Sequence, residues 1–358
     1  MKRTETRPIF VGNVQIGGQN RCVLQSMTNV PAKDVEASIE MINDLEAHGC
    51  EIARIAVLDE QDASAISAIR NGVHIPIVAD IHFNHLLALI ALDQGVEAIR
   101  INPGNIGSAA HTEAVVRKCQ EKHVPIRIGI NGGSLEKQFL QKYGKPCAEA
   151  MIDSAKRHVK ILEDLGFYDI CLSFKSSNVA LTIEAYEAAA KEFPYPLHLG
   201  VTEAGGFTSS AVKSSAALGT LLHEGIGDTI RVSVSGPPRD ELIIGKQLLK
   251  CFDLIDNVPD LIACPTCGRI QYDMLPIVRK AEEFLATLRA DITVAIMGCP
   301  VNGIQEAGRA DIGIAGAKDG GILFRNGEIL RTVPTDELYD ALVNEINVIL
   351  AEKNKLAH

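Results

Sequence analysis

The chain has 358 residues, 46% hydrophobic and 22% charged, a composition typical of globular proteins that excludes disordered and collagen-like classes. Its formal net charge of −10 argues against a nucleic-acid partner. No apolar run reaches the roughly 18 residues of a membrane span, and the N-terminal MKRTETRPIF lacks the apolar stretch of a signal peptide. We therefore expect a cytoplasmic protein without a membrane partner. Its nine cysteines are expected to be reduced, so clustered thiols are candidate metal ligands.

A hairpin is predicted over residues 8–21, and a repeating unit follows it to about residue 250. In each unit an amphipathic helix ends at a glycine, and a short, almost continuously apolar run follows, as expected of strands buried on both faces. The predicted strands cover 22–26, 51–57, 76–80, 98–102, 125–130, 168–173, 196–201 and 228–233. The glycines expected to end helices in the left-handed conformation are Gly49, Gly72, Gly95, Gly166 and Gly227.

Strands that alternate with helices predict a parallel α/β sheet with right-handed crossovers. Eight units in about 250 residues favour a closed (β/α)8 TIM barrel over residues 1–252, with the hairpin capping its bottom. A doubly wound open sheet is the alternative, but no glycine-rich dinucleotide loop follows the first strand.

A second, α+β domain is predicted over residues 259–358. Its expected elements are a helix at 273–289, a strand at 292–297 and a glycine-rich loop at 298–308. A hairpin turns at Asn326-Gly327, and a final helix at 335–352 has Thr335 as its N-cap.

Positively charged side chains follow the predicted barrel strands at equivalent positions. Reacting groups of TIM barrels gather at the carboxyl ends of the strands, and residues two apart share one face. A multiply charged anion, such as a phosphate or diphosphate ester, is the ligand that five converging cations favour. We name these five residues the cation cluster: Arg54, Arg100, Arg127, Lys175 and Arg231. Polar residues expected beside them are Asp80, His82, Asn102, Asn131, Thr202 and Ser233.

Glu203 is a carboxylate among these cations, and two interpretations fit it. It could be an ion-pair partner of Arg231 or Lys175, or it could be a general acid/base whose pKa the site tunes. His82 is equally open, because a packed or hydrogen-bonding histidine fits the pattern as well as a proton donor does.

Three thiols gather in the second domain: Cys264 and Cys267 in a CxxC motif, and Cys299 in MGCPVNG. A zinc site would normally add a fourth Cys or His, but only His358 follows Cys299. Three thiolates without a fourth soft ligand favour an iron–sulfur cluster, with Glu306 as an exchangeable oxygen ligand to one iron; zinc is the alternative. No CxxxCxxC triplet occurs, which disfavours S-adenosylmethionine radical chemistry.

The chain resembles the 4-hydroxy-3-methylbut-2-enyl diphosphate synthase family in the stretches QSMTN, VADIHF, IRINPGNIG, PIRIGINGGSLEK, PLHLGVTEAGG, HEGIGDTIRVS and ACPTCGR. The resemblance implies reductive ring opening of 2-C-methyl-D-erythritol 2,4-cyclodiphosphate to the linear allylic diphosphate, in the non-mevalonate isoprenoid pathway. It also implies that Cys264, Cys267, Cys299 and Glu306 ligate a [4Fe–4S] cluster and that Glu203 is the acid/base. The implied diphosphate ligands are Arg54, Arg100, Asn102, Arg127, Asn131, Lys175, Thr202, Arg231 and Ser233.

The chain departs from the family at Ile304-Gln305, where Pro-Gly is usual, and it corresponds to the short, two-domain form. A flavodoxin, a ferredoxin or a reductase could donate the electrons. A connection of about ten residues spans at most about 35 Å and starts at the bottom of the barrel, so we expect a homodimer in which each barrel mouth meets the partner's cluster. The competing functions are a pterin-binding barrel methyltransferase and a zinc-stabilised phosphate-binding protein.

Overall fold

The computed structural model describes residues 3–300, 305, 307–318 and 320–356. The chain divides into two compact units, residues 1–254 and 255–358. No helix among the described residues is long and apolar enough to cross a membrane.

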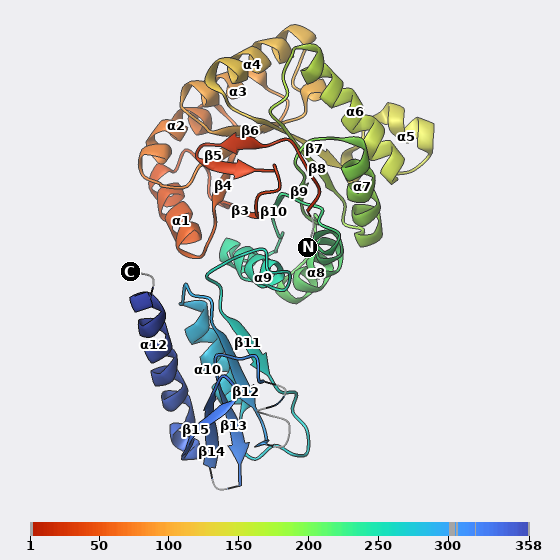
Figure 1. Ribbon diagram of the computed structural model, residues 1–358. Helices are drawn as coiled ribbons and strands as arrows, with labels where there is room; N and C mark the ends of the chain where they lie inside the picture. The colour runs from red at the N-terminus through yellow and green to blue at the C-terminus, as the bar shows by residue number, and fades with distance from the viewer. Residues whose placement is uncertain (1–2, 301–304, 306, 319, 357–358) are drawn as a thin grey trace. The chain divides into compact units, whose positions relative to one another are not determined.

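The first unit is a barrel of parallel strands surrounded by helices (Figure 1). Its eight-stranded sheet has the order β8-β7-β6-β5-β4-β3-β10-β9, and a bridge between Leu172 and Leu197 joins the two ends of this order. The predicted TIM barrel is therefore confirmed, and the doubly wound alternative is wrong. The strands are β3 (Val23–Met27), β4 (Ile52–Val57), β5 (Ile77–Ile81), β6 (Ala98–Ile101), β7 (Ile126–Asn131), β8 (Ile170–Lys175), β9 (His198–Leu199) and β10 (Thr229–Ile230).

The helices of this unit follow the strands in alternation, as the repeat predicts. Two 3-10 turns, η1 (Pro103–Asn105) and η2 (Gly132–Ser134), follow β6 and β7. The helices are α1 (Val35–Ala47), α2 (Glu60–Asn71), α3 (His85–Asp93), α4 (Ala109–Lys122), α5 (Lys137–Tyr143), α6 (Ala148–Asp164), α7 (Val179–Glu192), α8 (Phe207–His223) and α9 (Pro238–Lys250).

The N-terminal hairpin closes the bottom of the barrel, as predicted. Its strands β1 (Ile9–Val11) and β2 (Val14–Ile16) pair antiparallel. Ile9, Val11 and Ile16 are buried against residues from the beginning of the barrel strands: Val23, Ile52, Val78, Ala98 and Cys171. Burying this apolar surface stabilises the hairpin on the barrel and seals that end.

The glycines at the helix–strand joints have two different physical roles. Gly49, Gly95 and Gly166 have positive φ, as predicted for residues that end a helix. The prediction for Gly72 is wrong, because its φ is −102°. A Cβ atom at this position would lie 2.5 Å from Ile39 Cδ1, so close packing between α1 and α2 requires the glycine.

The second unit is a mixed five-stranded sheet, β11-β12-β13-β14-β15, in which the first three strands are parallel and the last three antiparallel. Leu285 of α10 and Leu342 of α12 pack with Ile296 and Ile314 of the sheet in one hydrophobic core. The elements are β11 (Asp260–Ala263), α10 (Leu275–Ala286), β12 (Thr293–Met297), β13 (Ile312–Ala317), β14 (Gly320–Arg325), β15 (Glu328–Val333), η3 (Thr335–Glu337) and α12 (Leu338–Leu356).

Two predictions for the second unit had opposite outcomes. Asn326 and Gly327 have φ of 49° and 79° and connect β14 to β15, which confirms the hairpin turn. Thr335 is not the N-cap of the last helix, because a 3-10 turn covers Thr335–Glu337 and the α-helix begins at Leu338. Pro334, which precedes the turn, has a non-helical ψ of 148°.

Candidate active site in the barrel

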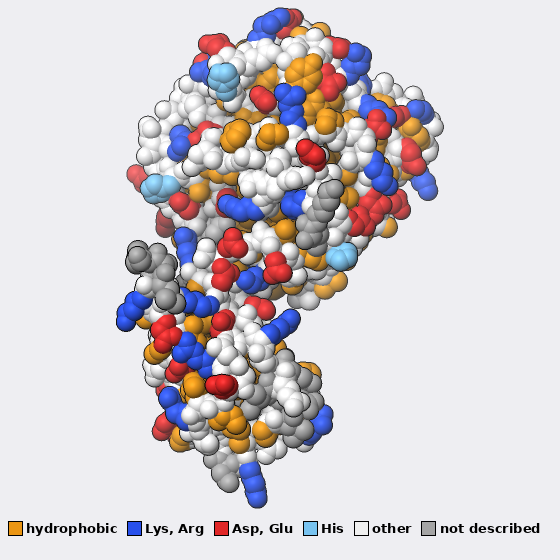
Figure 2. Space-filling model, viewed as in Figure 1, with side chains coloured by type: hydrophobic (Ala, Val, Ile, Leu, Met, Phe, Trp, Pro, Cys, Tyr) orange, Lys and Arg blue, Asp and Glu red, His pale blue; other side chains and the backbone are white. Residues whose placement is uncertain are grey.

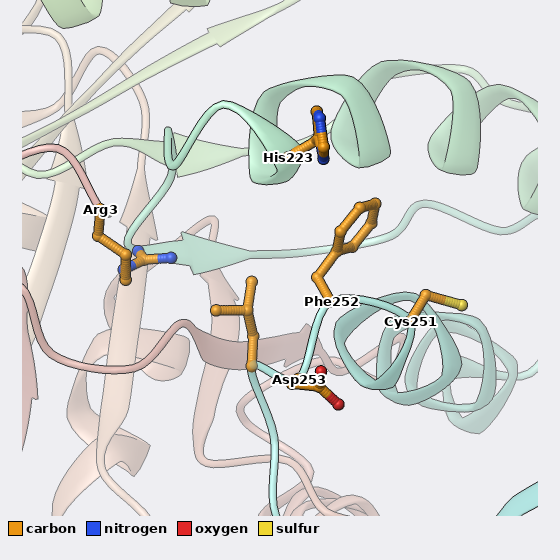
Figure 3. A pocket seen from close by; sticks show the side chains of 6 residues that line it. Arg3, His223, Cys251, Phe252 and Asp253 are labelled. Carbon is orange, nitrogen blue, oxygen red and sulfur yellow. The ribbon is translucent and has the colours of Figure 1, made fainter. Parts of the chain in front are cut away.

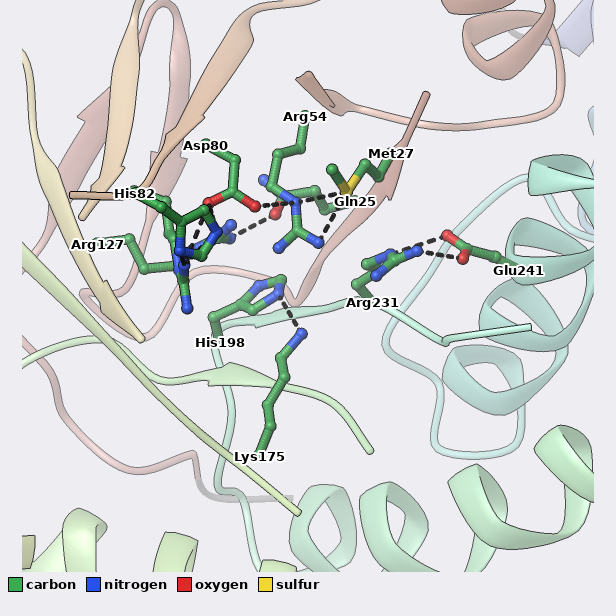
Figure 4. A network of polar contacts seen from close by, with 11 residues as sticks. Gln25, Met27, Arg54, Asp80, His82, Arg127, Lys175, His198, Arg231 and Glu241 are labelled. Atoms are coloured by element: carbon green, nitrogen blue, oxygen red, sulfur yellow. Dashed lines mark hydrogen bonds and ion pairs between the residues drawn. The ribbon is translucent and has the colours of Figure 1, made fainter. Parts of the chain in front are cut away.

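The cation cluster lies in the interior of the barrel, where its side chains converge from different strands (Figure 4). Lys175 ends β8, as predicted, whereas Arg54 and Arg127 lie within β4 and β7 rather than at their ends. Arg100 and Arg127 occupy neighbouring positions of the ladder between β6 and β7. Exposure is 5–8% for Arg100, Arg127 and Lys175, so these charges are largely removed from water.

Asp80 on β5 balances part of this charge. Its Oδ1 lies 3.3 Å from Arg100 Nη1, and its Oδ2 lies 3.6 Å from Arg54 Nε. Burial opposes ionisation of this carboxyl group, but Arg54, Arg100 and Arg127 outweigh burial and hold its pKa below the usual value. Asp80 therefore remains a carboxylate and fixes two arginines.

His82 stands beside this pair with its side chain half exposed. Its Nε2 lies 3.1 Å from Arg100 Nη1 and 3.5 Å from Asp80 Oδ1. Burial and the positive charges of Arg100 and Arg54 lower the pKa of His82, while Asp80 acts in the opposite direction. A neutral imidazole at this place can accept a hydrogen bond from Arg100.

Arg54 and Arg127 also have hydrogen-bond partners that carry no charge. Arg54 donates from Nε and Nη2 to the sulfur of Met27, at 3.1 and 2.9 Å. Arg127 donates from Nη1 to Gln25 Oε1, while its buried Nη2 has no hydrogen-bond partner among the described residues. Burial lowers the pKa of both guanidinium groups, which indicates that their positive charge is poorly compensated.

Arg231 follows β10 and pairs with Glu241 of α9 through two hydrogen bonds, from Nε to Oε2 and from Nη2 to Oε1. Ser26 of β3 donates to the same Oε2 at 2.8 Å. The carboxylate of Glu241 is almost fully buried. Glu241, and not Glu203, is therefore the ion-pair partner of Arg231.

Lys175 contacts the buried side chain of His198 on β9. The distance between Lys175 Nζ and His198 Nε2 is 3.4 Å, and His198 Nδ1 lies 3.4 Å from Thr229 Oγ1. Tyr186 of α7 donates its hydroxyl hydrogen to the carbonyl of His198. This network fixes the imidazole between the end of β8 and the beginning of β10.

Two glycines leave room for the long cationic side chains. A Cβ atom on Gly129 would lie 2.5 Å from Arg100 Nη2, and one on Gly200 would lie 2.9 Å from Lys175 Nζ. The Gly129 N–H also donates to Asn102 Oδ1 at 3.1 Å, so the backbone of β7 positions this amide side chain.

The remaining predicted ligands lie around this interior. Asn131 ends β7 in register with Lys175, and the Thr202 N–H donates to the carbonyl of Ser176 at 3.2 Å. The carbonyl of Ser233 accepts a hydrogen bond from Ser210 Oγ at 2.7 Å. All three residues are partly exposed, which suits contacts with a ligand.

Glu203 is exposed, and its side chain has no hydrogen bond or ion pair in the part of the chain that the structure describes. Its backbone has a φ of +55°, an uncommon value for a residue other than glycine. The interpretation of Glu203 as an ion-pair partner of Arg231 or Lys175 is therefore wrong for this structure.

The three candidate cluster thiols lie in two loops that the second unit brings near one another. Cys264 follows β11, and its N–H donates to the carbonyl of Ile296 on the neighbouring strand β12 at 3.0 Å. The Gln271 N–H then donates to the carbonyl of Gly298, directly before Cys299. Both loops therefore leave the same edge of parallel strands, where a ligand can lie between them.

Cys267 is the exposed thiol of this group. Hydrogen bonds from the backbone and side chain of Arg269 lower its pKa, which favours the thiolate that binds metals. Among the residues that are described, no three of His, Cys, Asp and Glu lie close enough together to hold a metal ion. Glu306 and Ile304 lie outside the described residues.

A separate cavity of about 480 Å³ lies beside the C-terminal ends of the barrel helices α8 and α9 (Figure 3). It is lined by Arg3, His223 and residues 251–254, which follow the C-termini of α8 and α9. None of the predicted ligands lines it. On the face shown in Figure 2, acidic and basic side chains of the barrel unit are interspersed, in contrast to the cations gathered inside.

Sequence reasoning missed Gln25, His198 and Glu241. Gln25 and His198 are large polar residues in otherwise mostly apolar runs that are typical of buried strands, VLQSM and PLHLG, and this contrast is the signal that could have identified them. Glu241 lies in the first turn of a helix, where acidic residues are common, so nothing distinguished it.

The fold and the site define a TIM-barrel protein whose barrel interior is rich in arginine. Family models match at residues 6–246, described as the GcpE TIM-barrel domain, and at residues 260–348, described as the GcpE protein C-terminal domain. The chain belongs to this family, which confirms the resemblance noted in its motifs.

Curated relatives agree along the whole chain. A protein of Bacillus mycoides named 4-hydroxy-3-methylbut-2-en-1-yl diphosphate synthase (flavodoxin) is 52% identical over 98% of this chain and 96% of its own length. A protein of Bacillus cytotoxicus with the same name is also 52% identical, over 98% and 95%.

Similar solved structures cover about two thirds of this chain. Plasmodium falciparum HPPK-DHPS superposes with a TM-score of 0.50 at 9% identity, covering 69% of this chain and 51% of that one. Yersinia pestis dihydropteroate synthase gives 0.45 at 11% identity, covering 67% and 98%. At 9% identity, the likeness to the Plasmodium falciparum protein is one of fold alone.

Proposed function

We propose that the protein is an oxidoreductase that converts 2-C-methyl-D-erythritol 2,4-cyclodiphosphate to 4-hydroxy-3-methylbut-2-enyl diphosphate with two electrons. The names of its relatives support this reaction. The structural observation that carries it is the cation cluster, whose four arginines and Lys175 are buried or partly buried and face only the carboxylates of Asp80 and Glu241 within the described barrel interior. A diphosphate ester supplies the missing negative charge.

The residues of the cation cluster are proposed to bind the diphosphate in different ways. The fork of an arginine matches two phosphate oxygens, whereas Lys175 offers a point charge. The unpartnered Nη2 of Arg127 is a donor ready for such an oxygen. Arg54, Arg100, Asn102, Asn131, Thr202, Arg231 and Ser233 complete the proposed diphosphate site.

Glu203 is proposed as the group that exchanges a proton with the departing hydroxyl, which leaves as water. Its exposed carboxyl group, without a partner of its own, is free to approach a bound substrate. The left-handed backbone costs about 1 kcal/mol or more, and such strain is typical of residues held in place for function.

Cys264, Cys267 and Cys299 are proposed ligands of a [4Fe–4S] cluster, with Glu306 as the fourth. The donor set fits, because two adjacent loops carry three thiols and Arg269 favours the thiolate of Cys267. When bound, such a cluster supplies the electrons that cleave the ring C–O bond. These thiols need a reducing compartment, which supports a cytoplasmic location. The names of the relatives support a flavodoxin as electron donor.

Removal of a cluster arginine tests the anion site. Arg100→Ala and Arg127→Ala should each weaken substrate binding by about 1.5–3 kcal/mol, the range for a charge-assisted hydrogen bond, which is about 10- to 100-fold in KM. Anaerobic turnover of the cyclodiphosphate with a chemical reductant measures this. Arg117→Ala, on the exposed surface of α4, is the matched control and should change nothing. An unchanged KM in both cluster variants would remove the anion site.

We further propose a homodimer in which the cluster of each chain serves the barrel of the other. The support is the short connection between α9, which ends at Lys250, and β11, which begins at Asp260. Mixing inactive Glu203→Gln chains with inactive Cys264→Ser chains should restore activity, because each heterodimer holds one intact site. Random exchange predicts about a quarter of the wild-type activity. A monomer by light scattering, or no recovery after verified subunit exchange, would contradict the arrangement.

A further inference from the structure

We propose that Lys175 is a neutral amine in the free protein, held against His198, and that it takes up one proton from solvent when a diphosphate ester binds. This inference rests on the proposed diphosphate site and deepens it. It assigns His198 a role as the positioning residue of Lys175, and it makes substrate binding a proton-coupled event.

The first observation concerns the side chains that contact Lys175. Its side chain is 8% exposed, and no carboxylate in the described barrel forms an ion pair with it. Among the residues that the structure describes, the only polar side-chain contact of Lys175 Nζ is with His198 Nε2, at 3.4 Å. The two carboxylates of the site are already engaged, since Asp80 pairs with Arg54 and Arg100, and Glu241 with Arg231.

The second observation is the positive charge that acts on Lys175 from four arginines on other strands. Arg54 approaches from β4, Arg100 from β6, Arg127 from β7 and Arg231 from the end of β10. Burial and these four cations lower the pKa of Lys175 well below its ordinary value. An arginine keeps its proton under all ordinary conditions, so the lysine is the member of the cluster that can relieve the repulsion by losing one.

The other titratable groups near Lys175 do not store the proton. Burial and the same cations lower the pKa of His198 well below its ordinary value, so the imidazole is neutral. Burial raises the pKa of the Cys171 thiol to about 12 and also raises that of Tyr186, so both stay protonated. Asp80 remains ionised because its arginines hold its pKa below the usual value, and Glu241 is bound by Arg231 through two hydrogen bonds.

The third observation is that His198 can satisfy both forms of the lysine. With the ammonium form, Nε2 accepts from Nζ and Nδ1–H donates to Thr229 Oγ1. With the neutral amine, Nε2–H donates to Nζ and the Thr229 hydroxyl donates to Nδ1. A hydroxyl group and a neutral imidazole can each reverse their roles, so the chain of contacts between Lys175, His198 and Thr229 survives the change.

Binding of the substrate reverses the electrostatic balance. Each phosphorus of the cyclic diphosphate carries one strongly acidic oxygen, so the ligand is a dianion that takes up no proton near neutral pH. Its two charges offset the arginines and return the pKa of Lys175 toward the ordinary value. Substrate affinity is therefore greatest at pH values below the pKa of Lys175 in the free protein. Between that pKa and the higher pKa of Lys175 in the complex, affinity falls about tenfold for each pH unit.

Calorimetric titration of the holoenzyme with the cyclodiphosphate, without a reductant so that no turnover occurs, measures the proton directly. Repeating the titration at about pH 8 in two buffers of different ionisation enthalpy gives the number of protons taken up. We expect close to one for the wild type. Lys175→Met should bind about 10- to 100-fold more weakly, without proton uptake and with an affinity independent of pH. Lys175→Arg, whose charge is permanent, should also take up none.

His198→Gln separates the two partners. The glutamine amide can still contact Nζ but cannot bind a proton, so uptake should persist in this variant. Uptake that is lost in His198→Gln and kept in Lys175→Met would overturn the inference by placing the proton on the imidazole. Binding by the wild type without net uptake would overturn it as well and leave the diphosphate site standing. No binding by the wild type would instead refute the proposed site itself.

Discussion

Replacement of Cys299 by serine is expected to remove iron from the protein and abolish turnover, and Cys264→Ser and Cys267→Ser should do the same. A serine hydroxyl stays protonated near neutral pH and is a poor ligand for iron, whereas a thiolate is the preferred one. Iron analysis, the visible absorption of anaerobically purified protein and the turnover assay measure the effect. Glu306→Ala should keep much of the iron and lose turnover, because three thiolates can still hold a cluster.

Cys251→Ser is the matched control for this series, since Cys251 is an exposed free thiol at the end of α9. It should retain both iron and activity. A Cys299→Ser protein with full iron content and full rate would show that this thiol is not a ligand. A colourless wild-type protein that binds zinc instead would favour the phosphate-binding alternative.

Glu203→Gln is expected to lower kcat by about 100-fold or more, the range typical of general acid–base groups. The amide keeps the size and polarity of the side chain but cannot exchange a proton with the departing hydroxyl. KM should change little, because the cation cluster is intact. Glu224→Gln, an exposed glutamate at the end of α8, is the control and should leave kcat unchanged.

The pH dependence of kcat distinguishes the acid/base role of Glu203 from a purely structural one. The wild type should lose rate where the carboxyl group changes protonation, and this limb of the profile should be absent in Glu203→Gln. Equal kcat values for the variant and the wild type would refute the assignment.

The barrel could be predicted because its signals are local and repeated. Each helix, glycine and buried run is visible within a short window, and eight repeats leave few alternative topologies. Gly72 shows the limit of this reasoning. A glycine is needed there because the side chain of Ile39, on another helix, leaves no room for a Cβ atom, and this contact joins segments far apart in sequence.

The arginines of the site could be predicted from the sequence, but their partners could not, for a related reason. Arginines in buried strands are conspicuous, so the cation cluster could be identified from the sequence, although Arg54 and Arg127 lie deeper in the strands than expected. The partners of the arginines could not be identified. Gln25 meets Arg127 only when the barrel closes, and the acidic residue Glu241 in the first turn of α9 gave no sign that it would pair with Arg231. The choice between ion-pair and acid/base roles for Glu203 likewise needed the position of Glu241.

The hairpin of β1 and β2 determines at which end of the barrel a ligand can enter and leave. Since Ile9, Val11 and Ile16 cover its bottom, the described part of the barrel leaves the carboxyl ends of the strands as the side from which a ligand can approach the cation cluster. If the cation cluster binds the substrate as proposed, substrate enters and product leaves at this end. Anything that covers this end during reduction therefore has to lift once in every catalytic cycle, so its opening rate sets an upper limit on turnover.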